Sequence, residues 1–444
     1  GIDVSKGKST VAVIRPFGEV VKAPFYVAHT VRGLAELADF ILSLDGESRA
    51  VIEYTGKYAE PVANALCNAG IFVCMVNAKL VHDYGGETIR RVKTDNVDAL
   101  KIAGYCLDKW GRLTRYTPEC ELRRTLKTCN RQLGEYAKLK TMLKNNLISL
   151  LDQTFPGINT LFTSAAREAD GHEKWIDFVA QFWHCECVSS LTLKAFSERY
   201  EKWCRRHGYN YSAKKAAEIH SAAAEQFGVL PRNDFTMLLI SQAVAQLNSL
   251  CEVVAALKTE MDRLAAQLPE YETVLSMHGV GKVLGAQLIA EIGDIRRYPK
   301  RSSLARFAGI EPPENQSGVY NQHSRRISKQ GSPHLRRTLF QVMSCILQLS
   351  RGDEQVFRFL NRKRGEGKPY KVYMIAGANK FLRIYYARVK ECIDKTQLLP
   401  DGIKGAEAVN NDFTCKQDRA TPEGDPSGCA GAQYRQEKAA ARIC

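Results

Sequence analysis

The chain has 444 residues with a formal net charge of +15 and an isoelectric point near 9.1, which is long enough for two or three domains with apolar cores. Such a basic balance favours a polyanionic partner, because each lysine or arginine that meets a phosphate releases condensed counterions. No apolar run reaches the roughly 18 residues needed to cross a bilayer, and the first residues do not form a signal peptide, so we expect a cytoplasmic protein with no membrane partner.

Residues 1–112 predict a compact α/β domain. Its first part holds three short β-rich runs, at residues 2–5, 10–15 and 20–27, which the turn segments 6–8 and 16–18 separate. Helical and buried-strand patterns then alternate, with helices expected at 31–44, 58–68 and 94–108 and strands at 50–54 and 71–77. Three antiparallel strands followed by alternating helices and strands is the order of the ribonuclease H-like fold.

Four carboxylates in this domain are candidate metal ligands. Asp3 alternates with apolar neighbours in the first strand, and Glu53 lies near the carboxyl end of its strand, where ligands of open α/β sheets gather. Thr94 suits a helix N-cap, so Asp95 and Asp98 share one face of the first turn. Neighbouring carboxylates repel, and a hard divalent cation such as Mg²⁺ or Mn²⁺ relieves that repulsion. Chance surface acids at a solvated helix start are the alternative.

Residues 113–268 predict a helical region with two heptad seams, at 121–151 and 240–268. Lys140 interrupts the first seam once, and Pro269 ends the second. The seams could form a coiled coil within one chain or between two chains, and the sequence does not choose. The first seam is strongly basic between Arg123 and Lys144, so its outer face either lies along nucleic acid or is simply solvated. Residues 160–232 are helical and irregular and indicate no function.

Residues 269–396 predict a mostly helical domain. It opens with Ser276 to Lys282, which has the form of a helix-hairpin-helix whose bare backbone N–H groups can bind a phosphate. A structural turn without a ligand is the alternative. A serine in the later Gly-adjacent loop could attack a phosphate, but chemistry alone does not select it from the other serines. Beyond residue 396 the polar, aperiodic composition predicts a disordered tail, 397–444.

Basic residues that precede or follow these motifs, together with two glycines of the 276–282 turn, are the candidate nucleic-acid contacts. The basic turn at 362–369, between two expected helices, also suits a phosphate. The candidates are Arg90, Arg91, Lys93, Gly279, Gly281, Lys282, Arg325, Arg326, Lys329, Arg336 and Arg337.

Fourteen cysteines are scattered without a regular framework, which is typical of reduced thiols in a cytosolic protein. One set of residues has a spacing that could bind zinc: Cys185 and Cys187, followed by Cys204 and His207. Neither half has the Gly-rich knuckle usual in such sites, so thiols without a metal are the favoured interpretation.

With these motifs in hand, the chain resembles the insertion-sequence one-ten family of DEDD transposases, which includes the Piv-type DNA invertases. The resemblance spans about residues 1–395 and rests on segments spread over both halves. They are Gly1-Ile2-Asp3-Val4-Ser5-Lys6, Glu53-Tyr54-Thr55-Gly56, Lys93-Thr94-Asp95-Asn96-Val97-Asp98-Ala99, Gly279-Val280-Gly281, Ala308-Gly309-Ile310-Glu311-Pro312, Gln316-Ser317-Gly318 and Ser328-Lys329-Gln330-Gly331-Ser332-Pro333-His334-Leu335-Arg336-Arg337. Residues from about 351 match more loosely, and the loop before Ser317 departs from the family by holding a single serine ahead of Gly318.

The resemblance implies a metal-binding tetrad of Asp3, Glu53, Asp95 and Asp98 and a catalytic serine at Ser317. It also implies a RuvC-like domain, a coiled coil and a C-terminal transposase domain, assembled as homodimers and tetramers on DNA. A structured noncoding guide RNA, the bridge RNA of the element, would pair with target and donor DNA.

Three functions therefore compete. The first is a recombinase that uses the acids and Ser317, and the second is a RuvC-like endonuclease or Holliday-junction resolvase that hydrolyses DNA with water. The third is a nucleic-acid-binding scaffold without chemistry. The four acids count against the scaffold, and the second, serine-bearing domain counts against a plain resolvase, because two-metal hydrolysis does not need it.

Overall fold

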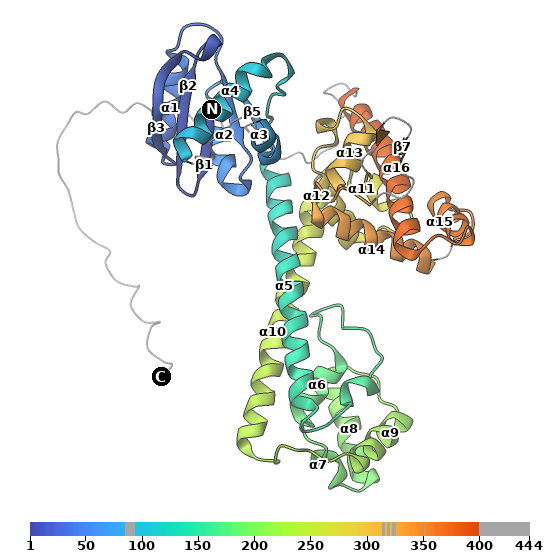
Figure 1. Ribbon diagram of the computed structural model, residues 1–444. Helices are drawn as coiled ribbons and strands as arrows, with labels where there is room; N and C mark the ends of the chain where they lie inside the picture. Colours follow the sequence, from blue (N-terminus) through green and yellow to red (C-terminus); the bar gives the residue numbers. More distant parts are fainter. Residues whose placement is uncertain (85–93, 313–315, 318–319, 322–325, 350, 399–444) are drawn as a thin grey trace, which may run out of the picture. The chain divides into compact units, whose positions relative to one another are not determined.

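The computed structural model describes residues 1–84, 94–312, 316–317, 320–321, 326–349 and 351–398 (Figure 1). Its contacts divide the chain into one unit at Gly1–Asp394 and a second at Lys395–Cys444. Of the second unit only the end of the last helix, residues 395–398, is described. The expected disordered tail therefore lies almost wholly outside the described residues.

The N-terminal region is a mixed five-stranded sheet in the order β3-β2-β1-β4-β5. The strands are β1 (Ile2–Ser5), β2 (Lys8–Ile14), β3 (Val20–Ala28), β4 (Arg49–Glu53) and β5 (Phe72–Val76). Strands β1 to β3 form the expected antiparallel meander, and β4 and β5 add to β1 in parallel. The prediction of an α/β region with three antiparallel strands first is confirmed.

Helices cover both faces of this sheet. One core joins the sheet to α1 (Val31–Leu42) and α2 (Ala59–Asn68) and includes Ile2 and Ile52. The core on the other face joins Val51 of β4 to α3 (Ala78–Tyr84) and α4 (Asp95–Asp108). Because side chains alternate along β4, Val51 and Glu53 belong to the face that α4 covers.

Two long helices, α5 (Glu121–Leu151) and α10 (Asp234–Ala265), pack against each other within the chain (Figure 1). They run antiparallel, because Leu126 shares a core with Met261 while Leu147 shares another with Ile240. The two seams thus pack against each other within one chain. Within the described residues α10 is also the one helix long and apolar enough to cross a membrane by length and composition, although a third of that apolar stretch is buried inside the protein.

Four shorter helices lie between these two in the sequence: α6 (Lys174–Gln181), α7 (Glu186–Ser189), α8 (Leu193–His207) and α9 (Ala213–Glu225). Aromatic rings fill their core, with Phe178 within 5.6 Å of Trp203 and 5.9 Å of Tyr200 between ring centroids. The ends of α5 and α10 complete this core.

Among its described residues, the last region consists of helices and one pair of short antiparallel strands. Its elements are α11 (Tyr271–Leu275), α12 (Lys282–Ile292), α13 (Arg301–Ala308), β6 (Gln316–Ser317), β7 (Tyr320–Asn321), α14 (Pro333–Leu349), α15 (Gln355–Gly365) and α16 (Tyr370–Leu398). Its core also takes in Leu126 and Leu133 of α5 and Val254 and Met261 of α10. The expected boundary at residue 269 therefore passes through a hydrophobic core.

Short 3₁₀ turns connect several elements: η1 (Pro16–Gly18), η2 (Gly56–Tyr58), η4 (Trp110–Arg112), η5 (Ile158–Leu161) and η6 (Ile295–Arg297).

Candidate active site

Asp3 and Glu53 lie next to each other on neighbouring parallel strands. Ile2 of β1 is in register with Ile52 of β4, so the following residues, Asp3 and Glu53, are adjacent as well. Ile2 and Ile52 are buried in the core below α1 and α2, whereas Asp3 and Glu53 are partly exposed. Strand alternation therefore puts both carboxylates on the opposite face, the one that α4 covers.

Helix α4 brings the second pair of acids to this face. Thr94 is its N-cap in extended backbone conformation, and its Oγ1 accepts a hydrogen bond from Val97 N at 3.3 Å. The helix begins at Asp95, so Asp95 and Asp98 lie in its first turn as the sequence predicts. Asp95 is exposed and Asp98 half-buried.

The direction of α4 brings Asp98 level with Glu53. Near its end, Cys106 Sγ donates to the carbonyl of Arg49, the first residue of β4, at 3.7 Å. From Arg49 to Glu53 the strand advances about 13 Å, and from Cys106 back to Asp98 the helix advances about 12 Å. Gly1 agrees with this alignment, because a Cβ built on it would lie within 2.3 Å of the α4 backbone at Ala99 and Ala103, closer than atoms can approach.

The four carboxylates share one end of the sheet, but their side chains do not form one cluster. Across the described residues, which include all four acids, no group of three or more His, Cys, Asp or Glu side chains is placed to hold a metal ion. The donor set still fits Mg²⁺ or Mn²⁺, since both prefer carboxylate oxygens. Thr55 Oγ1, two residues beyond Glu53, is buried and has no hydrogen-bond partner in the described part of the chain. This unsatisfied hydroxyl is a feature that sequence reasoning missed.

Ser317 lies in the β6–β7 hairpin, where it is opposite Tyr320. The acids and Ser317 are thus on separate elements, the acids on the N-terminal sheet and α4 and the serine in the last region. Ser332 has a different environment, because its Oγ accepts from Leu335 N and donates to Glu291 Oε2, both at 3.1 Å. These contacts give Ser332 a structural role as the N-cap of α14.

The expected phosphate-binding turn joins α11 to α12. Gly279 has a φ of 79° and packs against Ile346, where a Cβ would lie 2.5 Å from Cγ1. Gly281 is the N-cap of α12, has open space at its Cα and leaves the first turn without a side-chain cap. Lys282 Nζ lies 3.2 Å from Asp262 Oδ2, so a phosphate here would compete with a carboxylate.

The other basic candidates divide into three groups. Arg90, Arg91, Lys93 and Arg325 lie outside the described residues. Arg336 Nη1 donates to the carbonyls of Ala308, Lys329 and Gly331 at 3.1 to 3.3 Å, so it holds the loop before α14. Arg326, Lys329 and Arg337 are exposed.

The cysteine and histidine spacing does not make a zinc site in the described structure, which contains all four of these residues. Cys204 is buried beside Tyr200, and His207 stacks on Trp203 with 5.1 Å between ring centroids. Burial raises the pKa of the Cys204 thiol, which keeps it protonated.

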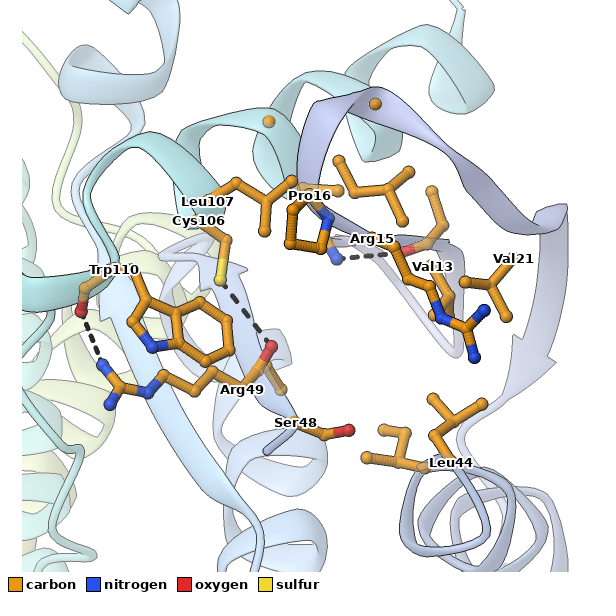
Figure 2. A pocket seen from close by; sticks show the side chains of 18 of the residues that line it. Val13, Arg15, Pro16, Val21, Leu44, Ser48, Arg49, Cys106, Leu107 and Trp110 are labelled. Carbon is orange, nitrogen blue, oxygen red and sulfur yellow. Dashed lines mark hydrogen bonds between the residues drawn. The ribbon is translucent and has the colours of Figure 1, made fainter. Parts of the chain in front are cut away.

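A pocket of about 900 Å³ opens at the other end of the sheet, near the starts of β1 and β4 and the end of α4 (Figure 2). The Arg49 guanidinium lies 4.4 Å from the centroid of the Trp110 ring, and Arg49 Nη1 donates to Trp110 O at 2.5 Å. Burial raises the pKa of Cys106. The pocket lies at the Arg49 end of β4 and the Cys106 end of α4, opposite to the ends that carry Glu53 and Asp98, although Ile2, the residue before Asp3, also lines it.

Comparisons with known proteins match segments in both halves of the chain. Residues 1–156 match a family model for the DEDD-type IS110 group, described as Transposase, and residues 271–356 match one described as Transposase IS116/IS110/IS902 family. An uncharacterized 44.8 kDa protein of insertion element IS116 from Streptomyces clavuligerus is 23% identical over 393 residues, which is 88% of this chain and 94% of that protein.

Two further relatives match shorter parts. An uncharacterized 42 kDa protein of insertion element IS900 from Mycobacterium paratuberculosis is 27% identical over 184 residues, 40% of this chain and 43% of that protein. The pilin gene-inverting protein of Moraxella bovis is 32% identical over 114 residues, 26% of this chain and 34% of that protein. Residues 157–270 and 357–444 lie outside both family models.

Proposed function

Because this chain belongs to the IS110 family of transposases, we propose that it cuts and rejoins DNA strands with a metal-binding acid set and a serine nucleophile. The observation that carries the acid set is the pairing of β1 with β4, which makes Asp3 and Glu53 neighbours. Helix α4 adds Asp95 and Asp98 at the same end of the sheet. These four residues would hold Mg²⁺ or Mn²⁺, which when bound stabilises negative charge on the phosphate under attack.

Ser317 would be the nucleophile. Its Oγ forms a bond to phosphorus while one P–O ester bond of the DNA breaks, so the number of phosphoester bonds is unchanged. The Oγ proton passes to a carboxylate oxygen, and the released deoxyribose oxygen takes up a proton. The bound strand can then be exchanged and rejoined by the reverse step without ATP.

The same proposal extends to the other parts of the chain. Residues 1–112 would act as a RuvC-like domain, α5 and α10 as a coiled coil, and α11 and α12 as a helix-hairpin-helix that binds a DNA phosphate at Gly281. The net charge of +15 supports DNA and a structured noncoding bridge RNA as partners. We further propose a cytoplasmic enzyme that works as a homodimer or tetramer.

The test is a reaction on end-labelled DNA with Mg²⁺, resolved on a denaturing gel. We expect a protein-linked DNA species that Ser317→Ala loses and that Ser328→Ala, a control in the same segment, retains. Cleaved DNA without any protein-linked species would favour the hydrolytic endonuclease instead. An adduct that persists in Ser317→Ala would show that another residue is the nucleophile.

A further inference from the structure

The hairpin formed by α15 and α16 carries a concentrated positive charge. Residues 355–371 contain six lysines and arginines and one glutamate, a net charge of +5 in 17 residues. A third of the net charge of the whole chain, +15, is therefore in this short segment. All but the first two of these residues lie beyond the second family model, which ends at residue 356.

The hairpin is rigidly built, so it presents these charges in fixed places. Gly377 of α16 packs directly on α15, because a Cβ there would lie 2.4 Å from Leu360 Cδ2. Leu360 is fully buried in the core of the last region. The turn is closed by main-chain hydrogen bonds from Gly367 N to Arg364 O and from Lys368 N to Lys363 O, and Gly367 has a φ of 72°.

Three cations from the two helices surround one ring. Arg362, Lys363 and Lys380 lie 5.3, 5.9 and 5.0 Å from the centroid of Phe359. Any two of them are therefore at most about 11 Å apart, close to the screening length of physiological salt. Glu366 forms ion pairs with Lys363 and Arg362, and the hydrogen bond from Lys363 and the charges of both cations lower the pKa of Glu366.

Four further cations of the hairpin are exposed, and the charge of one of them, Lys368, helps to lower the pKa of Glu366. Arg358, Arg364, Lys368 and Lys371 are all exposed, and no ion pair joins any of them to a carboxylate in the described part of the chain. A solvated helix face would more commonly intersperse acids among its bases. Exposed Tyr370, whose ring packs edge-on against Tyr373, lies among these charges.

We propose that the α15–α16 hairpin is a binding surface for a nucleic-acid phosphate backbone, contacted by Arg358, Arg364, Lys368 and Lys371. The surface would bind nucleic acid without sequence specificity, because lysine and arginine side chains that contact phosphates do not distinguish the bases. The inference rests on the proposed function only in taking a nucleic acid as the partner. Duplex DNA and single-stranded RNA offer the same phosphate chemistry, and the experiment separates them.

The experiment measures binding by the full chain in EDTA, where cleavage cannot occur, at several salt concentrations. The hairpin variant changes Arg358, Arg364, Lys368 and Lys371 to Gln, and its probes are a random-sequence duplex DNA and a random single-stranded RNA. Each phosphate that the variant no longer neutralises should make the slope of log K against log salt shallower, by about 0.9 for duplex DNA or about 0.7 for a single strand.

A matched control variant changes Arg199, Lys202, Arg205 and Arg206 of α8, also exposed, to Gln. We expect it to keep the parental slope although it removes the same charge. A shallower slope on one probe only identifies that nucleic acid as the partner of the hairpin. Parental slopes on both probes, or equal reductions of the slope in both variants, would overturn the proposal. If the fourfold variant unfolds, Arg364→Gln with Lys368→Gln should still make the slope shallower, by about half as much as four substitutions would.

The change in salt dependence does not depend on whether Ser317 forms a covalent bond to DNA. A protein that forms no adduct through Ser317 can still show the change in slope, and one that forms the adduct can still lack it. The two proposals therefore fail separately.

Discussion

The buried ion pair between Arg123 and Glu270 gives a direct test of what fixes α5 to the last region. Arg123 Nη1 donates to Glu270 Oε1 at 2.5 Å, and the two side chains are 8% and 1% exposed. Burial alone would lower the pKa of Arg123, but the hydrogen bond and charge of Glu270 outweigh it and raise the pKa above its usual range. The guanidinium is therefore charged in the folded protein, with Glu270 as its hydrogen-bonded partner and the charge of Asp294 as a weaker contribution.

The perturbation is Glu270→Gln, which keeps the shape of the side chain and removes its charge. Loss of one partner leaves a buried, uncompensated cation, which costs about 3–5 kcal/mol. For a cooperative unit of 150–250 residues each kcal/mol lowers the melting temperature by roughly 2–4 °C, so we expect a fall of about 6–20 °C. Replacing both partners, as Arg123→Met with Glu270→Leu, should restore most of this loss, because no charge remains buried.

Differential scanning calorimetry of the full chain measures these shifts. The control is Glu260→Gln, which breaks the exposed pair between Glu260 and Arg263 on α10 and should leave the transition almost unchanged. If Glu270→Gln melts with the parent protein, Arg123 does not depend on Glu270. If the double variant is less stable than Glu270→Gln alone, the cost lies in lost hydrogen bonding and not in a buried charge.

Three further predictions concern the site and the folded state. Asp98→Asn should reduce strand cleavage in Mg²⁺ at least about a hundredfold while leaving the melting temperature unchanged, because a lost metal ligand weakens charge stabilisation; cleavage at the parental rate would contradict the acid set. Ser332→Ala should cost about 1 kcal/mol as a lost helix cap yet retain the DNA adduct, as denaturant titration and the gel assay can show. The pKa of Asp170 is lowered to about 2, chiefly by the hydrogen bond from Arg167, so its stabilising effect is present above about pH 4 and lost as the pH falls toward 2. Asp170→Asn should therefore lower the melting temperature at pH 7 but not at pH 2, and an equal loss at both would contradict that assignment.

A final prediction concerns the RNA partner. Protein purified without nuclease should carry a discrete structured RNA, since the proposed guide is recognised through its shape and phosphates. Ribonuclease treatment should then abolish recombination, and it should lower the melting temperature because the bound RNA stabilises the folded protein. Copurification of random fragments only, with recombination unaffected by ribonuclease, would exclude the bridge RNA.

Local patterns were sufficient to predict the N-terminal strands and helices except α3 (Ala78–Tyr84), which sequence reasoning missed. Apolar alternation around Asp3 and the Thr94 cap placed β1 and the start of α4 correctly, because strand period and capping chemistry depend on neighbours in sequence. The adjacency of β1 and β4 depends on long-range pairing, which sequence reasoning could state only as a condition. Thr55 gave no signal, since an unsatisfied hydroxyl exists only once burial is known.

The long helices show where such patterns are ambiguous. Apolar seams on α5 and α10 match equally well within a chain or between chains, so only the fold decides. Lys140 interrupts the first seam, and the structure gives the reason: Lys140 Nζ reaches Glu173 Oε1 at 3.5 Å and the carbonyl of Gly171. Ser317 could not be selected by chemistry, because activation of a serine depends on groups far away in sequence.

The distribution of α5 and α10 over two hydrophobic cores limits how this protein can be divided. Leu126 and Leu133 complete the core of the last region, and Leu147 completes that of the aromatic helices. A fragment that starts at residue 269 would expose the surface these leucines cover, so it should aggregate when expressed alone. Exchange of modules between related genes is constrained in the same way: a crossover between α10 and α11 would join a new core to helix surfaces shaped for the old one.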